Sequence, residues 1–157
     1  MGHGTSPSFI RPAAARDAGR IAEILVFNNR LNFFPIFKDE RYSFCETQVV
    51  PLARQLARDR DALARTFVWD DGVLRGFVRV QGREVEKLFV DPCFQGRGVG
   101  AALLEFAVAR FEADRLWALE ANEGARRFYA AHGFVPAGES RFEESTDQRL
   151  LLLRRQN

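Results

Sequence analysis

Three glycines, Gly96, Gly98 and Gly100, stand within five residues, after a strand-like segment and before an apolar helical segment. Glycine lets a ligand approach the backbone closely and accepts positive φ angles. The free N–H groups in the first turn of the next helix point to one spot, where the helix dipole adds positive potential. Because glycines there would otherwise weaken the helix without a purpose, the segment favours a bound phosphate or pyrophosphate over an empty glycine-rich turn.

The pattern excludes one class of phosphate site and leaves another open. A P-loop is excluded, because no Lys-Ser/Thr pair follows the glycines. A dinucleotide site is an alternative, since Gly96-x-Gly98-x-x-Ala101 matches its looser motif and Glu120 falls near the position of the acid that binds ribose. Against it, the preceding strands are joined as hairpins, and only 57 residues follow Gly100, too few for the rest of such an enzyme.

The strands that must position this turn are separated by tight-turn sequences. Asp71-Gly72 divides the strand-like residues 66–69 and 73–80, and Gln81-Gly82 leads into residues 84–90. These segments predict an antiparallel meander.

After the meander, residues 98–112 are apolar on nearly all sides and predict a buried helix. Residues 115–119 predict a strand, Asn122 the cap of a short helix, and Gly133 the C′ residue that ends it. Two last strands are expected at residues 134–135 and 149–154.

The N-terminal part of the chain predicts a short strand at residues 9–11 and a helix capped by Asp17. Ser43-x-x-Glu46 has the form of a capping box and predicts a second helix, which Pro51 interrupts or opens. The resulting order is β-α-α-β-β-β-α-β-α-β-β, an α/β sandwich around a mixed sheet.

Two motifs in the same order carry a resemblance to a known family. The segment with Gln95, Gly98 and Gly100 fits Gln/Arg-x-x-Gly-x-Gly/Ala. The second motif is Asn-x-x-Ala-x-x-Phe/Tyr-Tyr followed by Gly-Phe, and it is matched by Asn122, Ala125, Phe128, Tyr129, Gly133 and Phe134. In these motifs, and in Val90-Asp91-Pro92 before them, the sequence resembles the GNAT superfamily of N-acetyltransferases.

The resemblance implies a fold and a domain organisation. The expected fold is a GNAT-like acyl-CoA N-acyltransferase fold, with a mixed, mostly antiparallel sheet of about seven strands flanked by about four helices. Residues 1–157 would form a single acetyltransferase domain with its core at about 8–155, and residues 1–7 would lie outside the core.

The resemblance also implies a site for acetyl-CoA as cosubstrate. The strand 84–90 would carry a bulge and splay from the strand 115–119, so that the pantetheine arm pairs with its exposed main chain like an added strand. The residues expected to bind the cosubstrate are Leu88, Phe89, Val90, Gln95, Gly96, Arg97, Gly98, Val99, Gly100, Ala101, Asn122 and Phe128.

The implied reaction is direct transfer of the acetyl group to a primary amine of a small molecule or peptide. An alkylammonium with a pKa of about 10 must lose a proton before it attacks, and the departing thiolate must gain one. Tyr129 holds the position of the acid that protonates the thiolate, with a core tyrosine as the alternative. Glu84 and Glu120 rank equally as candidate bases, Glu86 ranks third, and a water chain without any single base is a further alternative.

The acceptor site is expected along the loop between the first two helices. Phe33, Phe34 and Tyr42 are candidates for an aromatic wall that stacks the acceptor amine, and core packing or a dimer interface is an equal alternative. Homodimers are frequent in the family, which makes a homodimer an expectation by analogy.

Composition bears on the binding partners and the cellular location of the protein. The net charge of +2, with scattered arginines, predicts no nucleic-acid partner. No apolar run is long enough for a bilayer, no secretory leader is recognisable, and Cys45 and Cys93 flank no histidine cluster, so we expect a cytoplasmic protein with no membrane partner and no metal. The alternatives to an enzyme are a non-catalytic acyl-CoA sensor and a nicotinamide-dinucleotide protein.

Overall fold

The computed structural model describes residues 8–33, 48–143 and 146–156. The strands are β1 (Ile10–Pro12), β2 (Thr66–Asp70), β3 (Leu74–Gln81), β4 (Glu84–Val90), β5 (Arg115–Leu119), β6 (Phe134–Phe142) and β7 (Arg149–Arg155). The α-helices are α1 (Ala18–Asn28), α3 (Val49–Arg58), α4 (Arg60–Ala64), α5 (Val99–Phe111) and α6 (Glu123–Ala131). Three short helical segments complete the description: η1 (Ala15–Asp17), the π-helical η2 (Asn29–Phe33) and η4 (Pro92–Phe94).

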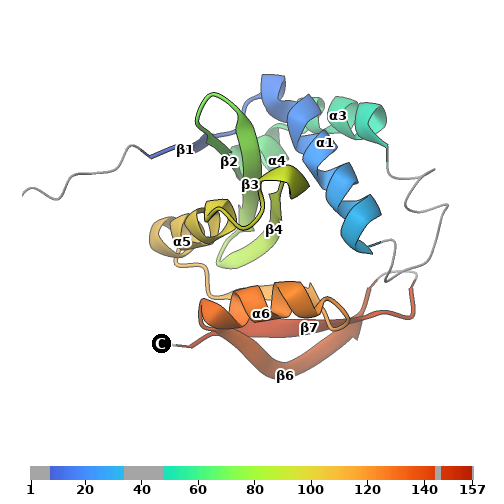
Figure 1. Cartoon of the computed structure of the whole chain (residues 1–157), viewed down its shortest axis with the longest axis vertical. Helices are drawn as coiled ribbons and strands as arrows, with labels where there is room; N and C mark the ends of the chain where they lie inside the picture. The colour runs from blue at the N-terminus through green and yellow to red at the C-terminus, as the bar shows by residue number, and fades with distance from the viewer. Residues whose placement is uncertain (1–7, 34–47, 144–145, 157) are drawn as a thin grey trace, which may run out of the picture.

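The strands form one seven-stranded sheet in the order β1-β2-β3-β4-β5-β7-β6. Every neighbouring pair is antiparallel except β4 and β5, which are parallel. This sheet confirms the predicted fold class. Figure 1 shows β1 to β4 with α1, α3 and α5 in one half of the molecule, and β6 and β7 with α6 in the other.

Alternation along β3 divides the core between the two faces of the sheet. Phe77 belongs to a buried cluster with Ile21 and Ile24 of α1. The next residue, Val78, belongs to a second cluster with Leu103 and other α5 residues. Helices α1 and α5 therefore cover opposite faces.

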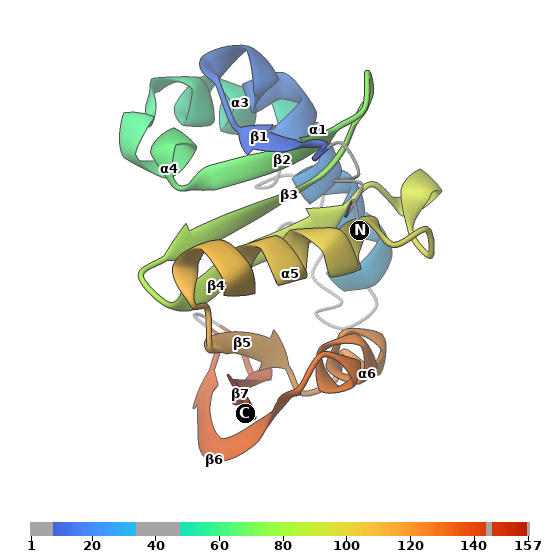
Figure 2. The ribbon, with the colours of Figure 1, turned by 90° about the vertical axis from the view of Figure 1, so that its left-hand side faces the viewer.

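Close contact between α5 and the sheet depends on Gly76 in β3. A Cβ atom at this position would lie 2.9 Å from the Phe89 carbonyl oxygen and 3.1 Å from a methyl carbon of Leu103. Glycine therefore lets α5 pack directly on β3 and β4, in front of which it runs in Figure 2.

The meander and the helix after the turn agree with the sequence prediction. The turns at residues 71–73 and 82–83 separate β2, β3 and β4, and α5 begins and ends within one residue of the predicted bounds. A strand begins at residue 134 as predicted, but its predicted end at residue 135 was wrong, because β6 continues to Phe142. Its pairing with β7 shifts register between Pro136 and Ser140, and residues 136–142 are all exposed, so no alternation of buried and exposed residues indicates the rest of the strand.

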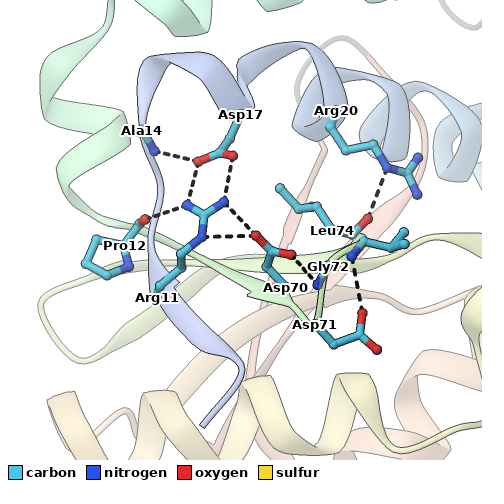
Figure 3. Close-up of polar contacts among 10 residues, drawn as sticks. Arg11, Pro12, Ala14, Asp17, Arg20, Asp70, Asp71, Gly72 and Leu74 are labelled. Carbon is cyan, nitrogen blue, oxygen red and sulfur yellow. Dashed lines mark hydrogen bonds and ion pairs between the residues drawn. The ribbon is translucent and has the colours of Figure 1, made fainter.

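Asp17 occupies the predicted N-cap position of α1, but the prediction that its side chain caps the helix was wrong. Its side chain makes no cap hydrogen bond to that helix. The carboxylate instead accepts a hydrogen bond from the backbone N–H of Ala14 at 2.8 Å and two from Arg11 at 2.8 and 2.9 Å. Arg11 also donates to Asp70 of β2, so the guanidinium joins two carboxylates (Figure 3). The network ties β1 to the segment before α1.

Pro51 opens a helix and does not interrupt it. It is the third residue of α3, where a helical N–H has no intrahelical partner and proline costs little. The expected capping box of Ser43 and Glu46 lies outside the described residues. Within the described residues no helix is long and apolar enough to cross a membrane.

The Arg11–Asp17 ion pair predicts a pH-dependent contribution to stability. The hydrogen bond from Arg11 holds the pKa of the Asp17 carboxyl below its ordinary value. A lowered pKa stabilises the fold at a pH above about 4, and this stabilisation is lost as the pH falls through the lowered value. We expect Asp17→Asn to lower the free energy of unfolding by about 2 kcal/mol at pH 7, and by less at pH 3.5.

Urea denaturation at the two pH values measures this difference. The control is Asp61→Asn, which removes an ion pair of an exposed carboxylate and should change stability by no more than about 0.5 kcal/mol. Equal effects of the two variants would contradict a structural role for the Asp17 network.

Candidate functional site

Strands β4 and β5 separate after two paired residues. Glu84 pairs with Arg115 and Val85 with Leu116, and no later pair joins the strands. On the other side of β4, Arg79 faces Lys87 whereas Val80 faces Val85, so Glu86 is an extra residue in β4. A bulge of this kind bends a strand and increases its twist. The bulge and the splay expected from the family resemblance are both confirmed.

The main chain of β4 presents polar groups to the gap. The Asp91 N–H donates to the Arg75 carbonyl at 2.8 Å and so points toward β3. Because these directions alternate along an antiparallel ladder, the amide and carbonyl groups of Leu88 and Val90 point away from β3, toward the gap. Leu88 and Val90 therefore form an edge that an extended ligand can pair with.

One end of this edge is closed by side chains. The Val90 carbonyl accepts hydrogen bonds from the amide groups of Asn28, at 2.9 Å, and Gln95, at 3.2 Å. Gln95 also donates to the Asn28 side-chain oxygen at 3.2 Å. Asn28, at the end of α1, therefore fixes the glycine-rich turn against the end of β4.

A cavity of about 870 Å³ extends from the gap to the turn and to α6. Ten of the predicted cosubstrate residues line it: Leu88, Phe89, Val90, Gln95, Gly96, Gly98, Gly100, Ala101, Asn122 and Phe128. The other two do not. The side chain of Val99, the first residue of α5, is buried in the core, and the guanidinium of Arg97 lies near the ring of Phe94.

The glycine-rich turn has the backbone geometry of an anion site. Gly96 and Gly98 have φ angles of 76° and 85°, and Gly98 is the N-cap of α5. The first amides of α5 are thereby left for a ligand at the positive end of the helix dipole. Gly100 lies against the ring of Phe128, which brings α6 to the start of α5.

Helix α6 supplies the opposite wall of the cavity. The Asn122 side chain accepts a hydrogen bond from the Ala125 N–H at 3.2 Å, which confirms it as the helix cap. Tyr129 lines the cavity beside Phe128. Burial raises the pKa of Tyr129 to about 12, so its phenol keeps the proton at neutral pH and can donate it. His132 also lines the cavity, and its Nδ1 lies 2.8 Å from the Phe128 carbonyl.

The candidate bases are not gathered in the cavity. Of the described residues, Glu84 and Glu120 are not among those that line it. Glu86 does line it, but its carboxylate accepts a hydrogen bond from Arg65 at 2.5 Å. Glu143, after β6, is a further carboxylate of the lining that the sequence analysis did not single out. The assignment of a base to Glu84 or Glu120 stays a prediction.

Several lining residues were missed as site residues, notably Lys87, Phe94 and Trp117. A detectable signal existed for Lys87, because a lysine interrupts the strand just before the apolar run that ends β4. Of the predicted acceptor wall, Phe34 and Tyr42 lie outside the described residues, and only the backbone of Phe33 is described, at the end of η2. Among the described residues no group of histidine, cysteine and acidic side chains is placed to hold a metal ion.

Known proteins match the segment of the chain that contains β4, the glycine-rich turn and α6. Residues 62–136 match the family model described as an acetyltransferase (GNAT) domain. Over 75 residues the chain is 39% identical to peptidyl-lysine N-acetyltransferase YiaC of Escherichia coli K12, which covers 46% of this chain and 51% of that protein. The chain thus spans about half the length of the curated relatives it matches.

Two solved structures share the fold. The solution structure of apo-form YjaB from Escherichia coli superimposes with a TM-score of 0.68 at 22% identity, covering 92% of this chain and 95% of that one. PaiA N-acetyltransferase from Thermoplasma acidophilum, in complex with coenzyme A, gives a TM-score of 0.53 at 15% identity, covering 92% and 97%. At these identities the likeness establishes the fold alone.

The backbone geometry of the glycine-rich turn predicts different effects on stability when Gly98 and Gly100 are replaced by alanine. Gly98→Ala places a side chain at a positive φ and should lower the free energy of unfolding by about 1–2 kcal/mol. Gly100 is helical, and an added Cβ would meet Phe128 and Val90 at 3.5 Å, an ordinary contact distance. Gly100→Ala should therefore leave stability unchanged or raise it by up to about 1 kcal/mol. Urea denaturation of the two variants tests this, and equal losses would show that the turn does not need the left-handed conformation.

Proposed function

Because this chain belongs to the GNAT superfamily, we propose that it is an N-acetyltransferase that moves an acetyl group from acetyl-CoA to a primary amine of a small molecule or peptide. One observation carries the proposal. The gap between β4 and β5 opens in the same cavity that the glycine-rich turn lines. An extended thiol arm and a diphosphate need this combination, because one pairs with a strand edge and the other binds helix amides.

The proposed contacts follow from the chemistry of the cosubstrate. The pantetheine arm pairs with the main chain of Leu88 and with the N–H of Val90, since the Val90 carbonyl is already bound by Asn28 and Gln95. Its diphosphate binds the amides at the start of α5, from Gly96 to Ala101. Asn122 donates from its amide NH₂ to the arm while its oxygen caps α6. A coenzyme A complex of a protein with this fold supports the choice of an acyl-CoA as donor.

Two residues of the cavity act on the thioester in this proposal. The Leu88 N–H donates to the thioester carbonyl and stabilises the negative charge that forms there during attack. Tyr129, protonated at neutral pH, gives its proton to the departing thiolate. The reaction is direct, because the amine attacks the acetyl carbon without an acetylated intermediate on the protein.

The acceptor amine is proposed as a class. YiaC and YjaB are named as peptidyl-lysine N-acetyltransferases, which supports an alkyl amine such as a lysine side chain among the acceptors. Phe33, Phe34 and Tyr42 remain the candidates for the acceptor wall. We further propose that the chain forms one domain with a core at residues 8–155, that it works in the cytoplasm, and that it forms homodimers.

Binding of acetyl-CoA is the first test. At a free concentration 100 times the Kd, acetyl-CoA should stabilise the fold by about 2.7 kcal/mol in a thermal-shift measurement, whereas NAD should give no shift. Thiol release with a lysine-containing peptide should then distinguish an enzyme from a sensor that binds without turnover. Absence of acetyl-CoA binding would overturn the proposal.

Tyr129→Phe tests the acid. The variant should keep the affinity for acetyl-CoA, since it removes a single oxygen from the cavity wall, but should lower kcat about 100-fold. Because the pKa of Tyr129 is about 12, the wild-type enzyme should lose no activity through ionisation of this phenol below about pH 11. Calorimetric titration and the pH dependence of kcat measure the two effects. An unchanged kcat would identify Tyr129 as a core residue only.

A further inference from the structure

Lys87 lies in the wall of the cavity at the point where β4 and β5 part. It follows the bulged Glu86 and is the second residue beyond the last β4–β5 pair, at Val85. Its side chain shares a face of β4 with Phe89, which packs against the cluster of α1 residues. Lys87 therefore projects on the α1 face of the sheet, whereas Tyr129 packs with the core cluster on the α5 face.

The choice of lysine is unusual in this chain. Among 23 basic residues, lysine occurs only at Lys38 and Lys87, and all the others are arginine. A guanidinium stays charged in proteins, whereas a lysine amine can lose its proton when it is buried. Of the lysine and arginine side chains among the described residues, Lys87 is the one that lines the cavity, and its chemistry allows it to exchange a proton.

The surroundings of Lys87 favour its neutral form. Its side chain is half-buried and makes no hydrogen bond or ion pair with any described residue. Arg79 stands directly opposite on β3, and the nearby Glu86 is already bound to Arg65. Burial lowers the pKa of Lys87 and the charge of Arg79 lowers it further, against the opposing effect of Glu86 and Glu143.

No other charged side chain in the described lining faces Lys87 from the remaining elements. The cavity-lining residues of α1 and η2 are Leu25, Asn28 and Asn29, those of β5 carry no charge, and α6 contributes Tyr129 and His132 on the opposite wall. Within the described part of the chain, the charges that act on the protonation of Lys87 are therefore those of Arg79, Glu86 and Glu143.

We propose that Lys87 is the general base of the transfer reaction and takes the proton of the acceptor ammonium on the α1 face of the sheet. This role rests on the proposed acetyltransferase function. In this proposal an amine, and not a carboxylate, accepts the proton of the acceptor. Tyr129 on the opposite wall still protonates the thiolate.

The proton balance closes without another reactant. The acceptor R–NH₃⁺ gives one proton to the neutral Nζ of Lys87, and its nitrogen lone pair forms a bond to the acetyl carbon. As the C–S bond breaks, the thiolate takes the proton of Tyr129, and the second proton of the acceptor nitrogen restores that phenol. Lys87 then releases its proton to water, so the sum is amide, free thiol and one proton.

The protonation of Lys87 can be measured directly, because the chain holds only two lysines. The whole protein labelled with ¹³C at lysine Cε should give two lysine signals, and Lys87→Arg assigns them by removing one. We expect the Lys87 signal to titrate below the ordinary lysine value of about 10.4, with and without acetyl-CoA. A Lys87 signal that titrates at or above that value overturns the proposal whether or not an acceptor is found.

Kinetics of Lys87→Arg separate proton transfer from charge. Arginine keeps the positive charge and a similar length but cannot accept a proton. With a lysine-containing peptide as acceptor, kcat/KM at pH 7 should fall about 100-fold while the Kd for acetyl-CoA stays unchanged. In the variant the rate should rise tenfold per pH unit up to the pKa of the free amine, whereas the wild-type rate should level off at the pKa of Lys87.

The matched control is Arg154→Lys, an exchange of the same two side chains at an exposed position of β7, which should leave the rate and its pH profile unchanged. If Lys87→Arg keeps the wild-type rate and profile, Lys87 recognises an anionic group of the acceptor or is only structural, and the proposal is wrong. A mass increase of Lys87 by one acetyl group would also overturn it, since the residue would then be an acceptor. Failure of acetyl-CoA to bind the wild-type protein would instead refute the acetyltransferase function.

Discussion

One extra residue in β4 determines the architecture of the site. With Glu86 inserted, the strand can pair with β3 along its whole length but with β5 only at its first two residues. Without the bulge, a parallel pair would continue, and its hydrogen bonds would consume the main-chain groups of Leu88 and Val90. The gap, the exposed edge and the cavity that joins them to the glycine-rich turn all depend on this interruption of the ladder.

The two walls of the gap differ in character, and this difference separates the two proton movements of the proposed reaction. On the α5 face, burial keeps the phenol of Tyr129 protonated. On the α1 face, burial and Arg79 favour a neutral amine at Lys87. Burial disfavours the charged form of both groups, so the same physical effect keeps the phenol protonated on one side and favours a neutral amine on the other.

Much of the fold and the turn could be predicted from sequence, because local patterns determine them. Tight-turn residues identified β2 to β4, apolar residues on all sides identified α5, and Gly98 and Asn122 marked helix starts that the structure confirms. The length of β6 was missed because its residues after Val135 are exposed and show no alternation of buried and exposed positions. Asp17 was misassigned because its stronger partner, Arg11, lies on the preceding strand and competes with the helix cap.

The site was predicted less completely, because proximity across the sheet is not local. Ten of twelve cosubstrate residues line the cavity since they belong to contiguous motifs, whereas Val99 turns into the core on the other side of the same helical turn. Lys87 and Trp117 come from separate strands, and only the parallel pairing of β4 with β5 brings them to one cavity. The roles of Glu84, Glu120, Phe33, Phe34 and Tyr42 stay predictions.

The closed end of the β4 edge has a consequence for the protein when no ligand is bound. Where β4 and β5 separate, each strand has an unpaired edge inside the sheet, and unpaired strand edges can pair with strands of other chains. Here the Val90 carbonyl is already bound by Asn28 and Gln95, and β4 and β5 diverge. A strand of another chain would therefore find few consecutive main-chain groups with which to form hydrogen bonds. Asn28 and Gln95, which close one end of the β4 edge, thus also protect the unliganded protein against aggregation by strand pairing in the gap.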